Sequence, residues 1–465
     1  MLNFIVNNKE VKTNTPAASS LVDFIRNELH LYGTKIGCRE GDCGACTILV
    51  GEIKDGELQY QTMNSCLMPL ANANHKHIVT IEGVNGPELS PIQAALVDNN
   101  GTQCGFCTPG FVMSFYGFCL NSGKEKNLEN AIEAISGNIC RCTGYKSIEK
   151  TAAAVVDKLQ SMPEAETTAW LVENEFLPDY FLAIPAKLKK IAPANAVTVG
   201  DSGYIIAGGT DILLQNPEGA IAAGKLNLVY GADKYSRIKF AGGQCHIGST
   251  TTIKNLKECR ELRNYIPKLD GYLKLMASTP IRNMATVGGN IANSSPIGDA
   301  CVILMALDAT LVLRHKGKTR ECELKDFFVG YKKVAKDPEE FIEWIYFDLP
   351  DARTHFSFEK ISKRGHLDMA TVNSAMRIDL DNGMITRAAF TVGGLGPTIR
   401  YLAKTAGYLA GKKISKQTFK EANRIAQGEI TPRSRADYKR SLVRQQLFIH
   451  LMSFSPATIS LEALR

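Results

Sequence analysis

The sequence predicts an α+β protein that is divided into several domains. Its 465 residues suffice for about three or four domains, each with a hydrophobic core of its own. Strand-like patterns fill residues 1–85, helical periodicity dominates residues 86–160, and strands alternate with helices from about residue 179 onward. The composition, with 45% hydrophobic and 22% charged residues, excludes a disordered or fibrous chain.

Charge and hydropathy narrow the possible partners. A net charge of +7 is small for this length and does not indicate a nucleic-acid partner. No run of about 18 apolar residues is present, so the sequence predicts no membrane-spanning helix. The first residues, MLNFIVNNKE, lack the pattern of an export signal. We therefore expect a cytoplasmic protein that binds neither nucleic acid nor a membrane.

The first 85 residues predict a short mixed sheet crossed by one helix. The helix begins at about Leu21, and Ser20 and Asp23 are expected to form a capping box at its start. Alternating or continuous apolar runs predict the strands. These are Leu2–Val6, Val11–Thr13, Thr47–Val50 and Ile78–Ile81.

The next stretch predicts a small helical bundle, because four apolar-periodic runs follow within about 75 residues. They start at Pro91, Pro109, Leu128 and Ile148. Residues 161–176 are polar and acidic without a clear period, which predicts a linker. A break near Leu349 divides the remainder into residues 177–350 and a last α+β domain over residues 351–465, where Arg433–Arg440 is expected to be a solvated helix face.

The cysteines are numerous and unevenly placed. Their number, 13, is odd and no export signal is evident, so a disulfide framework is a poor interpretation. Eight of them form two sets in the first third of the chain. The other five stand singly among apolar neighbours, and we expect them to be small buried side chains. They are Cys119, Cys245, Cys259, Cys301 and Cys322.

The first cysteine set lies in the segment GCREGDCGACTILV, which spells C-x4-C-x2-C, with a fourth cysteine further along. This is the plant-type spacing for a [2Fe–2S] cluster. Gly37, Gly41 and Gly44 are expected to allow positive φ and a close approach of backbone N–H groups to the sulfurs. Zinc is the alternative, although structural zinc sites favour paired C-x2-C motifs. The set consists of Cys38, Cys43, Cys46 and Cys66.

The second cysteine set combines C-x2-C in QCGFCTPG with C-x-C in NICRCTGY. Both pairs stand at the edges of predicted helices. A C-x-C pair is awkward for zinc, and a second iron–sulfur cluster is the better interpretation because one-electron carriers work in chains. The set consists of Cys104, Cys107, Cys140 and Cys142.

Two glycine-pair segments are candidates for binding a phosphate group. No G-x-G-x-x-G motif opens a strand–helix unit, so the common dinucleotide fingerprint is absent. Ile205–Ile212 reads IIAGGTDI, and Ala285–Asp299 reads ATVGGNIANSSPIGD. Small residues in both let backbone N–H groups reach phosphate oxygens, and two such loops could clamp a pyrophosphate. A simple tight turn is the alternative for each.

These motifs together resemble the molybdenum hydroxylase (xanthine oxidase) family. GCREGDCGACTILV, SCLMPL, QCGFCTPGFVMS and GNICRCTGY carry the resemblance for residues 1–160, and residues from about 180 resemble the flavin part of the same enzymes. The resemblance implies four domains. They are a ferredoxin-like β-grasp [2Fe–2S] domain over residues 1–85, a four-helix-bundle [2Fe–2S] domain over 86–160, an α/β FAD-binding domain over 177–350 and a C-terminal flavoprotein domain over 351–465.

The resemblance also implies roles for individual residues. Gln103 and Cys142 would lie close to a molybdopterin cofactor that a large partner subunit carries, in a hetero-oligomer expected to be a dimer of heterodimers. Lys360 would lie near the flavin ring, and Tyr331 beside the nicotinamide of NAD. The remaining FAD contacts implied are Ile205, Ile206, Ala207, Gly208, Gly209, Thr210, Asp211, Ile212, Met276, Thr286, Val287, Gly288, Gly289, Asn290 and Asp299.

The function implied is that of an electron conduit. Electrons released by substrate oxidation at molybdenum on the partner would pass through the second set's cluster, the first set's cluster and FAD to NAD. No side chain of this chain is expected to be a catalytic acid or base. The order of modules matches the iron–sulfur and flavin subunit of a two-subunit family member that oxidises purines. An aldehyde or N-heterocycle oxidoreductase is the alternative within the family, and a zinc-stabilised scaffold is the alternative outside it.

Overall fold

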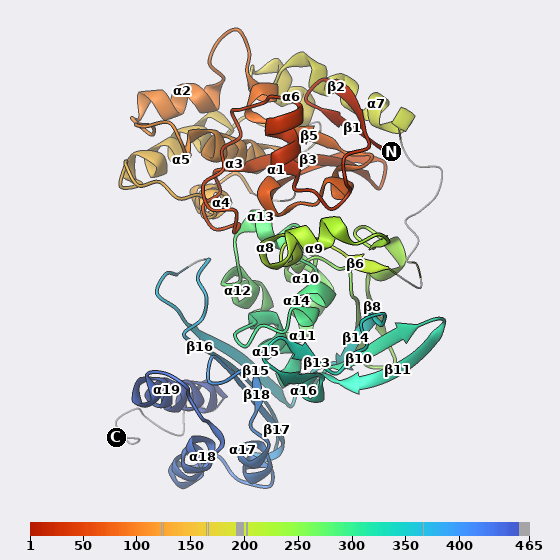
Figure 1. Cartoon of the computed structure of the whole chain (residues 1–465). Helices are drawn as coiled ribbons and strands as arrows, with labels where there is room; N and C mark the ends of the chain where they lie inside the picture. Colours follow the sequence, from red (N-terminus) through yellow and green to blue (C-terminus); the bar gives the residue numbers. More distant parts are fainter. Residues whose placement is uncertain are drawn as a thin grey trace. The chain divides into compact units, whose positions relative to one another are not determined.

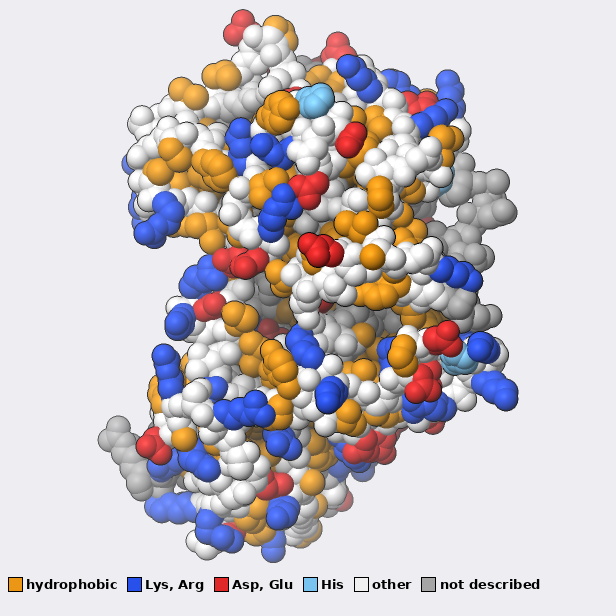
Figure 2. Space-filling model, in the orientation of Figure 1, with side chains coloured by type: hydrophobic (Ala, Val, Ile, Leu, Met, Phe, Trp, Pro, Cys, Tyr) orange, Lys and Arg blue, Asp and Glu red, His pale blue; other side chains and the backbone are white. Residues whose placement is uncertain are grey.

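The chain forms two compact units in a computed structural model. The described residues are 1–454, apart from residues 122, 124, 164, 166, 192–199, 201–202 and 366. Unit 1 consists of Met1–Thr198, Gly203–Tyr230 and Ala277–Ala285, and unit 2 consists of the rest of the chain. Figure 1 colours the chain by position, and Figure 2 shows basic and acidic side chains interspersed over the visible face. Among helices of the described residues, none combines the length and apolar character of a membrane span.

A five-stranded mixed sheet opens unit 1, as the sequence predicts. Its order is β2-β1-β5-β3-β4, with β1 parallel to β5 and the other pairs antiparallel. In β3, Ile48 and Val50 belong to one hydrophobic core and Leu49 to another, so the sheet is covered on both faces. The sequence missed β4. The strands are β1 (Leu2–Val6), β2 (Lys9–Thr13), β3 (Thr47–Lys54), β4 (Glu57–Asn64) and β5 (His77–Val79).

The helix that crosses this sheet begins where predicted but is capped differently. It consists of α1 (Leu21–Asp23) and a π-helical turn, η1 (Phe24–Glu28). The predicted capping box is wrong, because Ser20 makes no side-chain cap. Its hydroxyl donates instead to the Ser65 carbonyl at 3.4 Å, and its backbone forms a bridge with Pro69. A tertiary contact has therefore replaced the local cap.

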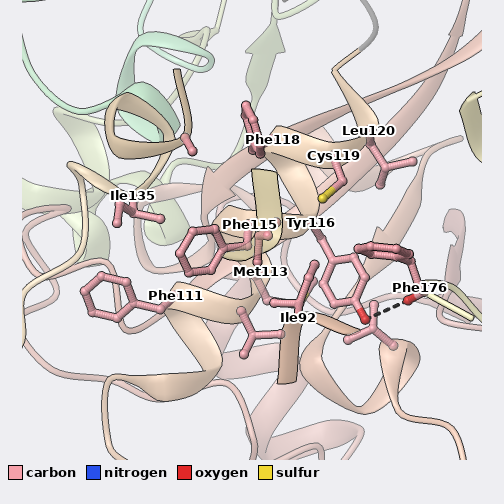
Figure 3. Close-up of a cluster of buried hydrophobic side chains, with 14 of the residues drawn as sticks. Ile92, Phe111, Met113, Phe115, Tyr116, Phe118, Cys119, Leu120, Ile135 and Phe176 are labelled. Carbon is pink, nitrogen blue, oxygen red and sulfur yellow. Dashed lines mark hydrogen bonds between the residues drawn. The ribbon is translucent and has the colours of Figure 1, made fainter. Parts of the chain in front are cut away.

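The four predicted helices form the second part of unit 1. They are α2 (Pro91–Asp98), α3 (Thr108–Leu120), α4 (Leu128–Ile135) and α5 (Lys146–Lys158). Helix α3 is apolar on all sides because it packs between its helical neighbours and the strands β3 and β4. Figure 3 shows the aromatic side chains that fill this core, including Phe111, Phe115 and Tyr116. The Tyr116 hydroxyl donates to the Phe176 carbonyl at 2.7 Å, which satisfies the buried oxygen.

The segment expected to be an irregular linker contains a helix. Within residues 161–176 the structure has α6 (Thr167–Glu173), and Leu171 and Phe176 are buried in the core of the helical bundle. These apolar residues were too few to give a visible period. Residues 164 and 166 of the predicted linker lie outside the described residues. A 3-10 turn (η5, Asp179–Ala183) and α7 (Ile184–Ile191) follow and pack on the first sheet.

The rest of unit 1 is a small βαβ element and one short helix. Strands β6 (Tyr204–Ile206) and β7 (Leu226–Leu228) are parallel and are joined through α8 (Ile212–Gln215) and α9 (Pro217–Ala222). Helix α13 (Thr279–Arg282) belongs to the same unit although it comes much later in the chain. Helix α13 is part of the segment Ala277–Ala285, which packs against the cysteine-containing part of unit 1.

Unit 2 contains two antiparallel sheets with helices around them (Figure 1). One has the order β11-β10-β14-β9-β8 and the other β15-β16-β17-β18; a two-stranded hairpin, β12-β13, is separate. The strands are β8 (Ile238–Ala241), β9 (Gln244–Gly248), β10 (Thr310–His315), β11 (Lys318–Glu323), β12 (Phe328–Gly330), β13 (Lys333–Val334), β14 (Phe341–Asp348), β15 (Thr354–Ile361), β16 (Val372–Asp381), β17 (Met384–Gly393) and β18 (Arg400–Tyr401).

The helices of unit 2 divide between its two sheets. Those after residue 400 pack on the second sheet and share its core. Within the basic run Arg433–Arg440, Arg440 is not simply solvated, because it donates to the carbonyls of Gln427 and Ile430 at the end of α18. The helices are α10 (Ile253–Glu258), α11 (Arg260–Tyr265), α12 (Leu269–Lys274), α14 (Val287–Ala292), α15 (Asp299–Ala306), α16 (Leu324–Phe327), α17 (Ala403–Leu409), α18 (Lys416–Glu429) and α19 (Ala436–Phe454).

The five single cysteines mostly behave as predicted. Cys119, Cys245 and Cys301 are buried, whereas Cys259 and Cys322 are half-buried. The predicted boundary of the last domain at residue 465 lies outside the described residues, which end at residue 454.

Candidate functional site

The first cysteine loop wraps its backbone around a thiol. Between η1 and β3, the Cys38 sulfur accepts the backbone N–H groups of Glu40 at 3.3 Å and Cys43 at 3.4 Å. A hydrogen bond from the Cys43 thiol is the main cause that lowers the pKa of Cys38 to about 5, and these N–H groups add to it. The loop therefore favours a thiolate, the form that binds metal.

The glycines of this loop are needed for two different reasons. Gly41 and Gly44 have φ of 72° and 68°, as predicted. Gly37 is not in the left-handed region, contrary to prediction. A Cβ at Gly37 would lie 2.7 Å from the Cys43 sulfur, so this glycine provides space for the thiol rather than a special φ.

The other two thiols of the first set meet at the open end of the β3–β4 hairpin. Thr47 pairs with Asn64 in the sheet, which places Cys46 and Cys66 just beyond the last rung. The Ser65 N–H and hydroxyl both donate to the Cys46 carbonyl and hold the two chain ends together. The Cys66 thiol donates a hydrogen bond to the Cys46 sulfur, which lowers the pKa of Cys46 and raises the pKa of Cys66. Both sulfurs are buried in the apolar core.

The second set pairs its thiols across the two motifs. Cys104 and Cys107 precede α3, and Cys140 and Cys142 lie between α4 and α5. The Cys104 and Cys142 sulfurs are 3.6 Å apart. Burial and, to a smaller extent, the hydrogen bond to Cys140 raise the pKa of Cys107 to about 12.

Hydrogen bonds support the second set from neighbouring residues. The Thr143 hydroxyl donates to the Cys140 sulfur at 3.2 Å, and the Cys140 N–H donates to the Tyr145 hydroxyl at 3.1 Å. The thiols differ in exposure, because Cys104 and Cys142 are exposed and Cys140 is buried. Gln103, which the family resemblance places beside the pterin, is exposed next to Cys104.

The arrangement of the eight thiols fits [2Fe–2S] clusters better than zinc. Each set consists of two thiol pairs. A [2Fe–2S] cluster takes two thiolates on each of two irons, so this pairing fits it. A tetrahedral zinc site instead places four ligands around one ion. The assignment of these eight residues as ligands stays a prediction.

The two cysteine loops are in direct backbone contact. The Ile139 N–H, next to Cys140, donates to the Cys43 carbonyl at 2.9 Å. The Asn138 side chain donates to the Gly44 carbonyl at 3.1 Å. A Cβ at Gly110 of α3 would lie 2.3 Å from that same carbonyl, so the close approach depends on this glycine.

The first glycine-pair segment forms a strand–turn–helix in unit 1. It runs from β6 through a turn into α8, at the carboxyl end of a parallel strand, where α/β proteins commonly bind ligands. Gly209 has φ of 80°, and a Cβ at Gly208 would lie 2.0 Å from the Met284 carbonyl oxygen. Within the described residues, the N–H groups of Gly208, Gly209 and Thr210 have no acceptor, which fits a turn that binds phosphate oxygens.

This turn lies against the first cysteine domain. A Cβ at Gly209 would come within 2.2 Å of the Pro69 ring, and the Asn72 side chain donates to the Ala207 carbonyl at 3.0 Å. Pro69 follows Cys66 by three positions. The candidate flavin loop is therefore packed directly beside the segment that carries Cys66.

The second segment, in unit 2, differs from expectation. The N–H groups of Val287 and Gly288 donate to the Thr251 and Ser249 carbonyls, and Gly289 donates to the Thr286 hydroxyl, which caps α14. These donors are used within the chain and are not free for a phosphate. The hydroxyls of Ser249 and Thr251 instead are buried with no partner among the described residues, and they suit a polar ligand. Sequence reasoning missed both.

Two predicted flavin contacts form a buried ion pair in unit 2. The Lys360 ammonium donates to Asp299 at 2.7 Å and to the Leu275 carbonyl at 2.8 Å. The Asn373 side chain donates to the other Asp299 oxygen at 2.6 Å. Burial raises the pKa of Asp299 although Lys360 opposes this shift. Asn373, which carried no local sequence signal, completes the cluster.

The remaining predicted contacts are placed as follows. Met276 is buried and follows Leu275 of that cluster. Tyr331 is exposed at the turn of the β12–β13 hairpin. The neighbouring Lys332 donates to the Asn293 carbonyl at 3.0 Å, which anchors this hairpin to the end of α14. The two glycine-pair segments belong to different compact units.

Comparison with known protein families gives four matches. A 2Fe-2S iron-sulfur cluster binding domain matches residues 4–71, and a [2Fe-2S] binding domain matches residues 80–153. An FAD binding domain in molybdopterin dehydrogenase matches residues 179–350. A CO dehydrogenase flavoprotein C-terminal domain matches residues 357–453. Each cysteine set lies within one of the two iron–sulfur matches.

The chain is similar to several curated proteins and to proteins of known structure. The chain is 29% identical to a xanthine dehydrogenase of Blastobotrys adeninivorans, over 95% of this chain and 40% of that protein. It is 27% identical to the xanthine dehydrogenase/oxidase of Gallus gallus, over 96% of this chain and 39% of that protein. The chain thus spans about two fifths of these relatives. A carbon monoxide dehydrogenase structure from Hydrogenophaga pseudoflava has 24% identity and a TM-score of 0.49, over 53% of this chain and 87% of that one.

The fold, the paired cysteines and the four domain matches define an iron–sulfur flavoprotein, and together they support the resemblance to the molybdenum hydroxylase family. The matched domains are two [2Fe–2S] domains, an FAD-binding domain and a flavoprotein C-terminal domain. The family resemblance and the multidomain α+β fold predicted from the sequence are confirmed. The two curated relatives described above are xanthine dehydrogenase proteins.

Proposed function

We propose that this chain is the electron-transfer subunit of a xanthine dehydrogenase. A large partner subunit would hold the molybdenum cofactor and oxidise hypoxanthine or xanthine, and this chain would take the electrons to NAD. The similarity to xanthine dehydrogenases supports the substrate class. The domain boundaries at residues 85, 160, 176 and 350 are part of the proposal.

One observation in unit 1 carries the proposal: the three candidate cofactor sites touch in series. The second cysteine loop contacts the first through the hydrogen bond from Ile139 to Cys43. The segment after Cys66 contacts the flavin loop through Pro69 and Gly209. The order along the unit is therefore second cysteine set, first cysteine set and flavin loop, which is the order that electron transfer to FAD requires.

The chain's own residues would hold and insulate the carriers. When bound, the clusters supply one-electron transfer and FAD joins one-electron to two-electron chemistry. Cys46 and Cys66 lie in the apolar core and would exclude water from the first centre. Cys104 and Cys142 are exposed, so the second centre would face the partner subunit.

The segment Ala277–Ala285, here called the α13 junction, would fix the distance between the carriers. Ile281 fills the space that a Cβ at Gly41 would occupy, which places the junction on the first cysteine loop. Arg282 forms a buried ion pair with Glu133 of α4 at 3.5 Å. The Met284 carbonyl lies against Gly208 of the flavin loop. One short segment thus contacts the first cysteine loop, helix α4 of the helical domain and the flavin loop.

The proposal is tested by co-expressing the tagged chain with the genes that flank its own and purifying the complex. We expect a molybdenum-containing partner and reduction of NAD with hypoxanthine or xanthine. Activity only with aldehydes or with another N-heterocycle would replace the substrate by the alternative within the family. A purified chain that binds zinc and no flavin would overturn the electron-transfer function.

A further inference from the structure

Arg39 occupies an unusual place in the first cysteine loop. It directly follows Cys38, and it is the basic residue of the segment IGCREGDCGA, which also contains Glu40 and Asp42. Its φ is 61°, a left-handed conformation that residues other than glycine rarely adopt. The side chain that leaves the loop at this position makes one strong interaction.

That interaction is a two-pronged ion pair with Asp23 at the end of α1. One guanidinium nitrogen of Arg39 donates to Asp23 Oδ2 at 2.9 Å, and the other donates to Oδ1 at 2.6 Å. A fork of this kind fixes the direction of the guanidinium as well as its distance. Asp23 lies on the helix that crosses the first sheet, so the sheet domain determines where this positive charge is placed.

The positive charge of Arg39 acts on two of the cysteine thiols. Arg39 interacts electrostatically with Cys46 and Cys66, the buried pair of the first set. The Arg39 and Asp23 side chains are 51% and 36% exposed, so salt would screen part of this interaction but not remove it. Net charge near a cluster is one of the factors that set its reduction potential.

We propose that Arg39, held in place by Asp23, raises the reduction potential of the cluster bound by the first cysteine set. Reduction adds one negative charge to the centre, and a neighbouring cation stabilises the reduced form more than the oxidised form. The Asp23 carboxylate acts in the opposite direction while it positions the guanidinium. The inference rests on cluster binding by the first set and is independent of the substrate or the final acceptor.

The test is a redox titration of the purified complex, followed by the paramagnetic signals of the two reduced clusters. The signal that is lost in Cys43→Ser is the one assigned to the first set. We expect Arg39→Gln to lower the midpoint potential of that signal. Arg39→Lys keeps the charge and should stay close to the unmodified protein, and the shift in Arg39→Gln should shrink at high ionic strength.

Two controls show whether a shift in potential is specific to Arg39 and to the first cluster. Lys12→Gln removes the same charge from an exposed ion pair with Glu10 on the edge strand β2, and it should leave the potential unchanged. The second cluster's signal serves as an internal reference and should not move. If Arg39→Gln behaves like Lys12→Gln, or raises the potential, the tuning role is wrong. A first cluster present with unshifted potential would contradict this inference and leave the proposed function standing, whereas absence of both clusters would contradict both.

Discussion

The two cysteine sets share one pattern of thiol pairing and differ in their surroundings. In the first set, Cys46 and Cys66 are 2% and 5% exposed at the end of a β-hairpin. In the second set, Cys104 and Cys142 are exposed in loops at helix ends. A hairpin surrounds its last residues with the core of a sheet, whereas a loop between helices leaves one side open. The first set is thus suited to relay electrons inside the chain, and the second to exchange them with a partner.

Replacing one thiol in each set should give the largest effects and test this difference most strongly. Cys66→Ser should abolish the paramagnetic signal of the first cluster after reduction, and Cys142→Ser should abolish that of the second. Cys66 is buried, so the serine hydroxyl in Cys66→Ser should destabilise the fold by about 1–3 kcal/mol. Cys142 is exposed, so Cys142→Ser should not destabilise the fold in this way. Retention of both signals in either variant would contradict the ligand assignment.

The next effect concerns the buried ion pair that joins the helical domain to the α13 junction. Glu133→Gln removes the carboxylate charge from this buried pair with Arg282, so we expect a loss of about 3–5 kcal/mol in the free energy of unfolding. Urea unfolding of the whole chain measures it. Glu149→Gln is the matched control in the same domain, because its pair with Lys146 is exposed and is worth about 0.3–0.5 kcal/mol. Equal effects would show that the junction does not depend on this pair.

A smaller effect should come from the contact between the two cysteine loops. Gly110→Ala would place a Cβ 2.3 Å from the Gly44 carbonyl, and the overpacking should cost about 1–3 kcal/mol and move the loops apart. Rapid-mixing measurement of flavin reduction should therefore show slower transfer between the clusters. Gly407→Ala is the matched control in helix α17, where a Cβ has nothing within 4 Å. It should be neutral or stabilise the helix by up to about 1 kcal/mol.

Acid should affect the two cysteine domains differently. Burial lowers the pKa of His77, in β5, to about 3 from its ordinary value of about 6.5. Between about pH 6.5 and pH 3, His77 is therefore protonated in the unfolded chain and neutral in the folded chain. The free energy of unfolding should fall by about 1.4 kcal/mol for each pH unit below pH 6.5, down to about pH 3. Residues 86–160 contain no histidine, so the helical domain lacks this contribution.

The measurement is urea unfolding between pH 7 and pH 5, followed by signals from each domain. His77→Gln should flatten the pH dependence of the first domain. His30→Asn, at an exposed position with φ of 56°, should leave it unchanged. An unchanged slope in His77→Gln would show that another group causes the acid sensitivity.

Local sequence patterns predicted the elements whose periodicity is strong. The four helices of the bundle and the β1–β2 hairpin appear where predicted, because apolar spacing alone determines their buried faces. Strand β4, ELQYQTMN, was missed because its polar residues mask the alternation. Helix α6 was missed because Leu171 is its one buried residue.

The cysteine motifs could be recognised from spacing, but their pairing could not. Cys104 pairs with Cys142 only because α4 and α5 fold the second motif back onto the start of α3. Similarly, the glycine pair at Gly288 looked available for phosphate, whereas its N–H donates to the Ser249 carbonyl from β9's loop. Such contacts depend on residues far apart in the chain and carry no local signal.

The central claim is that two thiol-paired centres stand in series with a flavin. The most direct measurement is the iron, labile sulfide and FAD content of the anaerobically purified chain, together with its paramagnetic spectrum after reduction. The account predicts about four iron and four sulfide per chain, one FAD and two distinct cluster signals. A colourless protein with zinc and no labile sulfide would contradict it.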